Sequence, residues 1–295
     1  MISGYGLENL ILEQANLSKF VPLVPYYDHG WSLNDQMSRS IIENPSNEHF
    51  AWNKRQVKLH SKLNKKFYIT GSPYIFYVDK YLIKKKQIKN TIFFLSHSTP
   101  KIRQEINFEE LMVKLNSLPE NLKPIDICLH YYDIKLKKMF NENGFKVRCS
   151  GKVNNNDYPS EFFKILTEYS FSCSNTLGSY VLYSLYLDIP FFLIGTEPLY
   201  DNFGLDKNVM RKYRVSEYKY SKNIFPLFRN FVSKITPEQK KMMEYELGLL
   251  DRIDNNLLRK VILDSLKQSL INPLKFKSLL RSLARTGFMK IKSLT

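Results

Sequence analysis

The segment FSCSNTLGSYVLYSLYLDIPFFLIG (Phe171–Gly195) carries the clearest structural signal in this chain. Its first apolar run ends in small polar residues, Gly178 opens a segment with helical spacing of apolar residues, and a second apolar run follows Pro190. Two buried strands joined by a helix form the right-handed crossover of a parallel sheet. The stretch therefore predicts an α/β fold with parallel strands.

The same alternation extends back to Thr91. Three earlier apolar runs are each followed by a helical segment: TIFFL (Thr91–Leu95), IDICLHYY (Ile125–Tyr132) and FKVRC (Phe145–Cys149). Asn107 should cap the first of these helices, and Gly144 should end the second. Because the strands are apolar throughout, helices should cover both faces of the sheet. We predict a Rossmann-like domain with five parallel strands between Thr91 and Gly195.

The flanking segments are less regular. Before the sheet, the pattern predicts a helix near Leu7–Asn16, an apolar run at Phe20–Tyr27, a helix over His49–Leu63 and a strand in Lys66–Gly71. After Thr196 the chain is irregular and then helical, with a capping box at Thr236 and Gln239. We therefore expect a small α/β unit over residues 1–85, the Rossmann-like domain over residues 86–230, and C-terminal helices with a basic tail over residues 231–295.

The chain is strongly basic. Of its 295 residues, 44 are Lys or Arg and 28 are Asp or Glu, which gives a formal charge of +16. This charge favours polyanionic partners: phosphorylated small molecules, an anionic membrane surface or nucleic acid. No nucleic-acid-binding motif occurs, and the aromatic residues lie in apolar runs rather than among basic ones, so we expect no nucleic-acid partner.

The C-terminal tail is basic and amphipathic. It carries no acidic residue from Asn272 onward, and its apolar stripe consists of Phe276, Leu279, Leu280 and Leu283. The stripe suits either an anionic membrane surface or the body of the protein. No apolar run reaches the roughly 18 residues of a membrane-spanning helix, and the N-terminus lacks a signal-peptide pattern. We expect a cytoplasmic protein, peripheral on the inner face of the plasma membrane if the tail binds lipid.

Cysteine and histidine residues do not predict a metal centre. Cys128, Cys149 and Cys173 lie in separate apolar runs, as buried free thiols of a reducing compartment do. The five histidines show none of the spacings of metal-ligand motifs. The sequence therefore predicts neither a metal nor a bound cofactor.

The turn within the opening stretch is the strongest candidate for phosphate binding. Ser174, Asn175 and Thr176 follow the first strand, and Gly178 and Ser179 open the helix. Free backbone N–H groups and the positive end of a helix dipole attract phosphate at such a position. We expect these five residues to hold a phosphate, and a capped turn without ligand is the structural alternative.

A second polar turn follows the strand that begins at Thr91. It contains His97, Ser98 and Thr99, which should emerge at the same edge of the sheet, where open α/β folds bind ligands. His97 can hold a phosphate, act as an acid or make one structural hydrogen bond. We expect the three residues to contribute to the same phosphate site.

A third candidate is VPYYDHGWS (Val24–Ser32). Asp28 and His29 directly follow a predicted strand, and Gly30 permits a sharp turn. Asp28 is placed to act as general base on an acceptor hydroxyl, and His29 is the rival base. An Asx-type turn with an adjacent histidine is the structural alternative.

Together these motifs resemble GT-B glycosyltransferases of bacterial surface-polysaccharide clusters, which build capsule, lipopolysaccharide and exopolysaccharide. The likeness covers most of residues 20–250: a strand running into DHGW, a WNKRQ helix, a YITGSP exit, then FLSHST and SNTLGSYVLYSLYLDIPFFLIG. It implies two Rossmann-like domains, with a nucleotide-sugar bound between them. The first is short for this fold, so either the C-terminal helices complete it or the chain is a reduced member.

A fainter likeness connects three motifs with bacterial CMP-sialic acid transferases. Asp28-His29-Gly30, His97 and Ser174-Asn175 are similar to the acidic-acidic-Gly, His-Pro and Ser-Ser/Thr motifs of that family. There the acidic residue is the base, and the histidine and serines hold the nucleotide phosphate. This chain has His29 at the second acidic position, Ser98 in place of the proline and Asn175 in place of the second serine.

The resemblance implies a metal-independent glycosyltransferase that moves a sugar from a nucleotide-sugar donor to a saccharide or lipid-linked acceptor. Residues 1–85 would then form the acceptor side. A nucleotide-sugar epimerase and a glycerophosphate-type transferase are the enzyme alternatives. A non-catalytic binding protein of the same pathway is the alternative of a different class.

Overall fold

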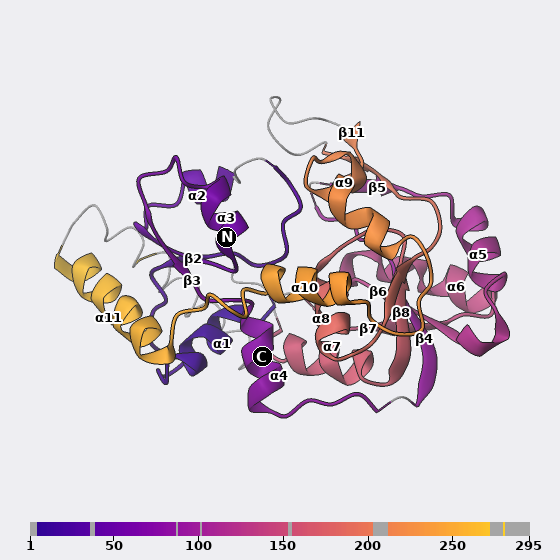
Figure 1. Cartoon of the computed structure of the whole chain (residues 1–295), viewed down its shortest axis with the longest axis horizontal. Coiled ribbons are helices and arrows are strands. Elements are labelled where there is room, and N and C mark those ends of the chain that lie inside the picture. The colour runs from indigo at the N-terminus through magenta and orange to yellow at the C-terminus, as the bar shows by residue number, and fades with distance from the viewer. Residues whose placement is uncertain are drawn as a thin grey trace.

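A five-stranded parallel sheet organises the larger part of the molecule (Figure 1). The computed structural model describes residues 5–35, 39–86, 88–100, 102–152, 155–202, 212–271 and 280. The strands are β4 (Lys89–Phe94), β6 (Ile125–Leu129), β7 (Lys146–Cys149), β8 (Tyr169–Ser174) and β9 (Phe191–Leu193). They pair in parallel in the order β7-β6-β4-β8-β9. The predicted five-stranded sheet between Thr91 and Gly195 is confirmed.

Helices cover both faces of this sheet. Helices α5 (Phe108–Asn116) and α6 (Lys137–Glu142) share one core with Phe93, whereas α7 (Tyr158–Leu166) and α8 (Ser179–Tyr186) share the other with Phe94. Neighbouring residues of β4 thus enter opposite cores, because side chains alternate along a strand. The predicted helix signals also hold: the Asn107 side chain accepts the Glu110 N–H at 3.1 Å, and Gly144 follows α6 with φ of 83°.

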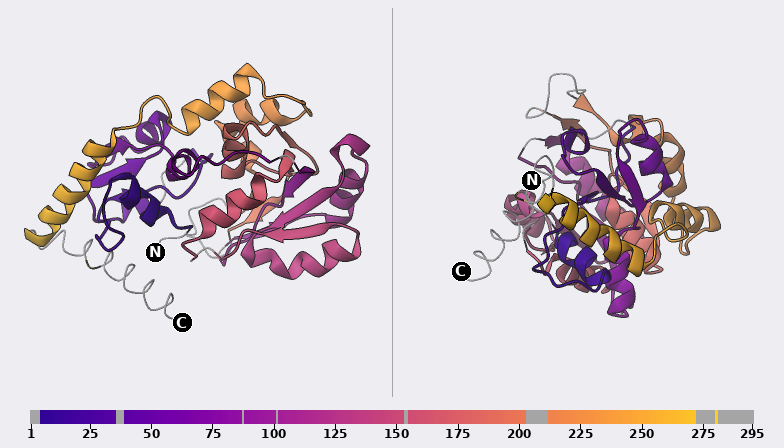
Figure 2. Two further views of the ribbon diagram at one scale, coloured as in Figure 1. Left: turned by 90° about the horizontal axis from the view of Figure 1, so that it is seen from below. Right: turned by 90° about the vertical axis from the view of Figure 1, so that its left-hand side faces the viewer.

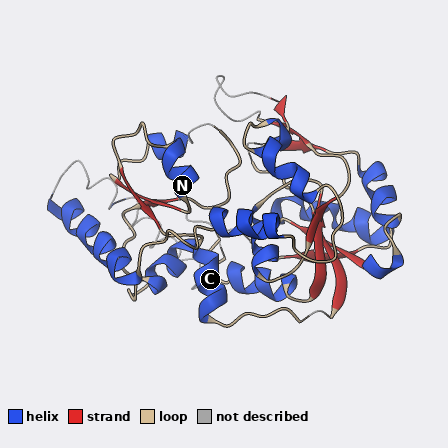
Figure 3. Ribbon diagram, viewed as in Figure 1, coloured by secondary structure: helices blue, strands red, loops and turns tan. Residues whose placement is uncertain are grey.

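A second, smaller parallel sheet is built from the first 70 residues (Figure 3). Its strands are β1 (Tyr26–Tyr27), β2 (Glu48–Ala51) and β3 (Lys66–Ile69), in that order. The helices of this unit are α1 (Leu7–Gln14), α2 (Arg39–Ile42), α3 (Lys54–Leu59) and α4 (Pro73–Lys80). The chain is therefore a mixed α/β protein with two separate parallel sheets.

The helix predicted over His49–Leu63 is wrong at its start. Residues 48–51 form β2, which pairs with β1 on one side and β3 on the other and is buried throughout. The helix begins only at Lys54, after Asn53, whose side chain accepts the Gln56 N–H at 3.0 Å. Pairing on both edges outweighs the helical spacing of this segment, because sheet hydrogen bonds and burial come from distant residues.

Two helices lie near the C-terminus, and α11 (Asn255–Ile271) is the one seen against the small unit in Figure 2. Helix α10 (Pro237–Glu246) has the predicted capping box at Thr236 and packs against α8. Helix α11 contacts the C-terminal end of α1, where Arg259 donates to the Ala15 carbonyl and Asn255 accepts from Gln14 at 3.4 Å. Helix α11 thus packs on the small unit, whereas α10 packs on α8 of the larger one.

The remaining elements are short. A small antiparallel sheet joins β5 (Arg103–Glu105), β10 (Leu199–Asp201) and β11 (Lys212–Tyr213). The other turns of helix are η1 (Glu120–Leu122), η2 (Tyr131–Leu136), η3 (Val215–Glu217), α9 (Ser221–Ile224) and η4 (Phe225–Phe228). Among the described residues, none of the helices has the length and apolar character needed to cross a membrane. The predicted amphipathic tail helix lies outside the described residues, apart from Leu280.

Candidate functional site

The two predicted polar turns lie side by side. Strands β4 and β8 are neighbours, with Phe94 opposite Ser174, so the turns that follow them leave the same edge of the sheet. The Ser96 N–H donates to Asn175 Oδ1 at 3.3 Å and joins the two turns. The strand order reverses between β4 and β8, which is the position where open α/β sheets bind ligands. The predicted adjacency of these turns is confirmed.

Two buried side chains at this edge of the sheet carry polar atoms without a hydrogen-bond partner in the part of the chain that the structure describes. Asn175 and Thr176 are buried, yet Asn175 Nδ2 and Thr176 Oγ1 have no hydrogen-bond partner among the described residues. Buried polar groups are nearly always hydrogen-bonded, so unpaired ones need a ligand, a water molecule or another explanation. The N-cap of α8, Gly178, provides no side-chain cap for the first turn of the helix. These donors and the helix dipole together suit an anion.

The two serines of the predicted phosphate site have partners within the protein. The Ser174 hydroxyl pairs with the Tyr180 hydroxyl at 2.8 Å and accepts the Thr176 N–H at 3.2 Å. The Ser179 hydroxyl accepts the Trp31 N–H at 2.9 Å, a bond between the two parallel-sheet units. Ser174 therefore stabilises the turn, and Ser179 connects the units.

His97 lies on a second histidine that the sequence did not identify as a site residue. The rings of His97 and His130 stack with centroids 4.2 Å apart. His130 Nδ1 accepts the Tyr132 N–H at 3.3 Å, so a neutral His130 carries its proton on Nε2 and donates it to the Tyr5 hydroxyl at 3.3 Å. His130 directly follows strand β6, and this position could have indicated from the sequence that it lies at the same edge of the sheet as His97.

Two hydrogen bonds from backbone N–H groups to side chains fix the turn that carries His97. The Ser98 N–H donates to Asp133 Oδ2 at 2.8 Å, and Thr99 Oγ1 accepts the Ile102 N–H at 3.0 Å. Burial lowers the pKa of His97, the Asp133 carboxylate opposes this effect, and the charge of His29 adds to it. His29 of the small unit is thus within electrostatic reach of His97 at the sheet edge.

Asp28 and His29 have different surroundings. The Asp28 carboxylate is 13% exposed, and its Oδ2 lies 3.1 Å from Nε2 of the fully buried His49 in β2. The Asp28 N–H also donates to the Phe50 carbonyl. His29, by contrast, is exposed. Asp28 is therefore anchored in the small unit, and His29 is the more accessible side chain of the pair.

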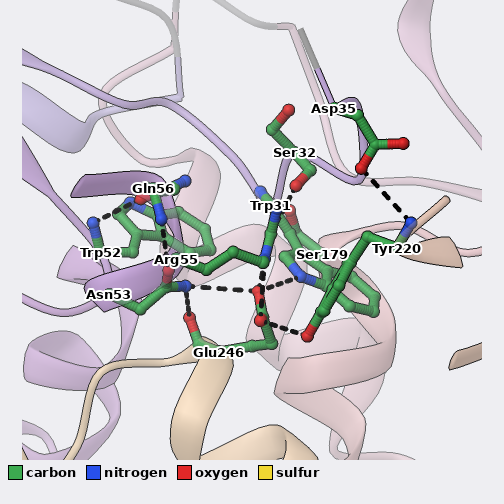
Figure 4. Close-up of polar contacts among 10 residues, drawn as sticks. All are labelled: Trp31, Ser32, Asp35, Trp52, Asn53, Arg55, Gln56, Ser179, Tyr220 and Glu246. Atoms are coloured by element: carbon green, nitrogen blue, oxygen red, sulfur yellow. Dashed lines mark hydrogen bonds and ion pairs between the residues drawn. The ribbon is translucent and has the colours of Figure 1, made fainter. Parts of the chain in front are cut away.

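A buried carboxylate beside this turn was not predicted (Figure 4). Glu246, the last residue of α10, is fully buried. It accepts hydrogen bonds from four side chains: Trp31 at 2.6 Å, Asn53 at 3.3 Å, Arg55 at 3.0 and 2.8 Å, and Tyr220 at 2.6 Å. Arg55 also lies over the Tyr220 ring, 4.2 Å from its centroid. We call these five residues the Glu246 cluster.

The Arg55 guanidinium compensates the negative charge of Glu246 within the cluster. Burial alone would lower the pKa of the Arg55 guanidinium, but the hydrogen bonds and charge of Glu246 outweigh burial and raise it. A paired arginine and carboxylate with further donors is the arrangement in which a buried charge is tolerated. The cluster joins the small unit to α10. Its member Trp31 follows His29 by two residues, which connects the cluster to the Asp28-His29 turn.

The described residues contain no group of three or more His, Cys, Asp or Glu side chains placed to hold a metal ion. The three cysteines are free thiols. Cys128 is buried, which raises the pKa of its thiol to about 12. A thiol with so high a pKa is protonated at neutral pH and is a poor nucleophile.

Acid should destabilise the fold through the stacked histidines. Burial, assisted by the charge of His97, lowers the pKa of His130 from 6.5 to about 3. Between these values the unfolded chain binds more protons than the folded one, so the stability that neutral His130 provides is complete above pH 6.5 and declines as the pH falls. The His130→Gln variant should therefore lose less melting temperature between pH 7 and pH 5 than the wild type. Equal losses, measured by thermal denaturation at both pH values, would contradict this.

Comparisons with known proteins give only distant likenesses. No protein-family model matches the chain, and no curated protein matches its sequence, so the sialic acid transferase likeness gains no support. Among solved structures, the wall teichoic acid polymerase TagF is similar with a TM-score of 0.40 and 14% identity, over 86% of this chain and 68% of that chain. A variant of the same polymerase, soaked with CDPG, is similar with a TM-score of 0.35 and 13% identity, over 77% of this chain and 58% of that chain. Likeness at this level assigns neither an activity nor a ligand to this chain.

Proposed function

We propose that this chain is a GT-B type glycosyltransferase of bacterial surface-polysaccharide synthesis. It would move a sugar from a nucleotide-sugar donor to a saccharide or lipid-linked acceptor. The observation that carries the proposal is the pair of buried, unpartnered donors, Asn175 Nδ2 and Thr176 Oγ1, where the strand order reverses. The turn of the other unit that carries His29 lies against the same edge, where the Trp31 N–H donates to Ser179 Oγ at 2.9 Å.

The donor phosphate would lie at the start of α8. Asn175, Thr176 and the backbone N–H groups that follow Gly178 would donate to its oxygens, with His97 on the neighbouring turn. As the bond from the sugar carbon to the phosphate oxygen breaks, that oxygen gains negative charge. Preorganised neutral donors and a helix dipole stabilise such a charge without moving during the reaction. This part of the site would lower the barrier by stabilising the leaving group.

The acceptor hydroxyl would lose its proton to the Asp28-His29 turn. The acceptor oxygen forms the new bond to the sugar carbon, and its proton passes to a base on the opposite side. His29 is exposed, and an imidazole has a pKa nearer to neutral than a carboxylate. The Asp28 carboxylate is hydrogen-bonded to His49 and fixes the turn. These surroundings favour His29 as the base, with Asp28 as its rival.

Three alternatives from the sequence stay distinguishable by experiment. An epimerase would convert the donor without an acceptor. A glycerophosphate-type transferase would use a nucleotide-linked glycerol in place of a nucleotide-linked sugar. A non-catalytic protein of the pathway would bind the nucleotide without turnover. A lipid-linked acceptor would agree with the basic tail and a position on the inner face of the plasma membrane.

The Asn175→Ala variant should bind its donor more weakly. Losing a hydrogen bond to a charged group costs about 1.5–3 kcal/mol, so the dissociation constant should rise about 10- to 100-fold. Titration calorimetry with UDP-, CMP-, GDP- and CDP-linked donors checks this. Asn141→Ala is the matched control, because Asn141 is exposed on α6, away from this edge. If both variants bind the preferred donor as tightly as the wild type, Asn175 is no phosphate ligand.

A further inference from the structure

The turn that carries His29 is anchored on both flanks. On one side, the Asp28 carboxylate is hydrogen-bonded to buried His49. On the other side, the Trp31 indole N–H donates to Glu246 Oε2 at 2.6 Å, and the Trp31 backbone N–H donates to Ser179 Oγ at 2.9 Å. Only two residues, His29 and Gly30, lie between these anchors. We propose that Trp31 and Glu246 are positioning residues, which hold His29 opposite the phosphate turn of α8.

Trp31 connects three parts of the molecule. Its ring is buried, its indole nitrogen reaches the end of α10, and its backbone reaches the first residue of α8. A Cβ on Gly30 would lie 3.4 Å from Ser179 Oγ, so the turn passes close to the start of α8 (Figure 4). We infer that the anchored Trp31 fixes how far His29 lies from the turn at Ser174–Ser179, because only Gly30 separates the two residues.

Glu246 gives Trp31 a rigid partner. The carboxylate is fully buried, and its Oε2, which accepts the Trp31 indole N–H, also receives hydrogen bonds from Asn53 and Arg55. A carboxylate with its oxygens held by several donors has little freedom to rotate. A base must lie within about 3 Å of the oxygen whose proton it accepts, and a misplacement of about 1 Å can cost about 100-fold in rate. Fixing Trp31 thus serves the reaction and not only the fold.

This inference rests on the proposed function and is tested with two variants that each remove one donor to Glu246. Trp31→Phe removes the indole N–H and keeps an aromatic ring. Tyr220→Phe removes the hydroxyl that donates to Glu246 Oε1 at 2.6 Å and keeps its ring, but Tyr220 is not part of the His29 turn. Both variants should lose comparable stability. Only Trp31→Phe should lower kcat, by about 10- to 100-fold, while the donor dissociation constant stays near the wild-type value.

A spectroscopic measurement separates this inference from the proposed function. With histidine labelled at Cε1, the His29 signal is assigned from its loss in a His29→Gln variant. The signal should shift in Trp31→Phe and keep its position in Tyr220→Phe. A shift in both variants, or in neither, overturns the positioning role. If the wild type transfers nothing, the proposed function fails, and the His29 signal still shows whether Trp31 holds the turn.

Discussion

Replacing Glu246 by alanine should cost about 3–5 kcal/mol of unfolding free energy, because breaking a buried ion pair leaves one charge without a partner. The Arg55 side chain is only 14% exposed and would keep its charge in a site built for a carboxylate. The Trp31, Asn53 and Tyr220 donors would lose the same acceptor. Urea denaturation checks the prediction through tryptophan fluorescence, since both tryptophans, Trp31 and Trp52, are buried in the small unit.

Glu244→Ala is the matched control for this variant. Glu244 lies on the same helix, is half-buried and has no ion pair among the described residues. Its replacement should change the unfolding free energy by less than about 1 kcal/mol. If Glu246→Ala is as stable as Glu244→Ala, the Glu246 cluster does not hold the small unit to α10.

The second large effect is expected at His29. His29→Ala should lower kcat about 100- to 10,000-fold, which is the usual contribution of a positioned general base. Donor affinity should stay nearly unchanged, because the proposed phosphate contacts come from the other unit. His29 is exposed, so the variant should also keep the melting temperature of the wild type. Steady-state kinetics and donor titration on the same preparation check both statements.

Asp28→Asn distinguishes the two rival bases. Asparagine keeps the shape of Asp28 and its capacity to accept a hydrogen bond from His49, but it is not a base. The variant should retain most of its turnover if His29 accepts the proton. A strong loss in Asp28→Asn together with normal turnover in His29→Ala would make Asp28 the base. Normal turnover in both would show that this segment is a structural turn.

The larger sheet could be predicted from sequence because its signals are local. Each strand is an apolar run, and caps such as Asn107 and Thr236 mark where helices begin. Strand β2 was misjudged because its partners, β1 and β3, lie more than fifteen residues away on either side in the chain. The antiparallel sheet of β5, β10 and β11 was not predicted, since strands of two or three residues carry almost no pattern.

The site was predictable only in part for a similar reason. The adjacency of the two polar turns follows from strand order, which the alternation of strands and helices implies. The partners of Ser174 and Ser179 cannot be read from strand order. Tyr180 and Trp31 reach these serines only through the packing of the folded chain. The Glu246 cluster joins four distant segments. The one feature of the sequence that could have indicated the cluster is the position of Glu246. It lies seven residues after Gln239 and therefore on the same, buried face of α10.

Turnover of a nucleotide-sugar is the most direct test of the proposed sugar transfer. The purified chain is incubated with UDP-, CMP-, GDP- and CDP-linked donors, and phosphorus NMR follows the release of free nucleotide. We expect one class of donor to be consumed, slowly by water alone and faster with a saccharide or lipid-linked acceptor. We also expect His29→Ala to lose this turnover and still bind the donor. Binding without turnover of any donor in the wild type, or conversion of the donor sugar without release of nucleotide, would contradict it.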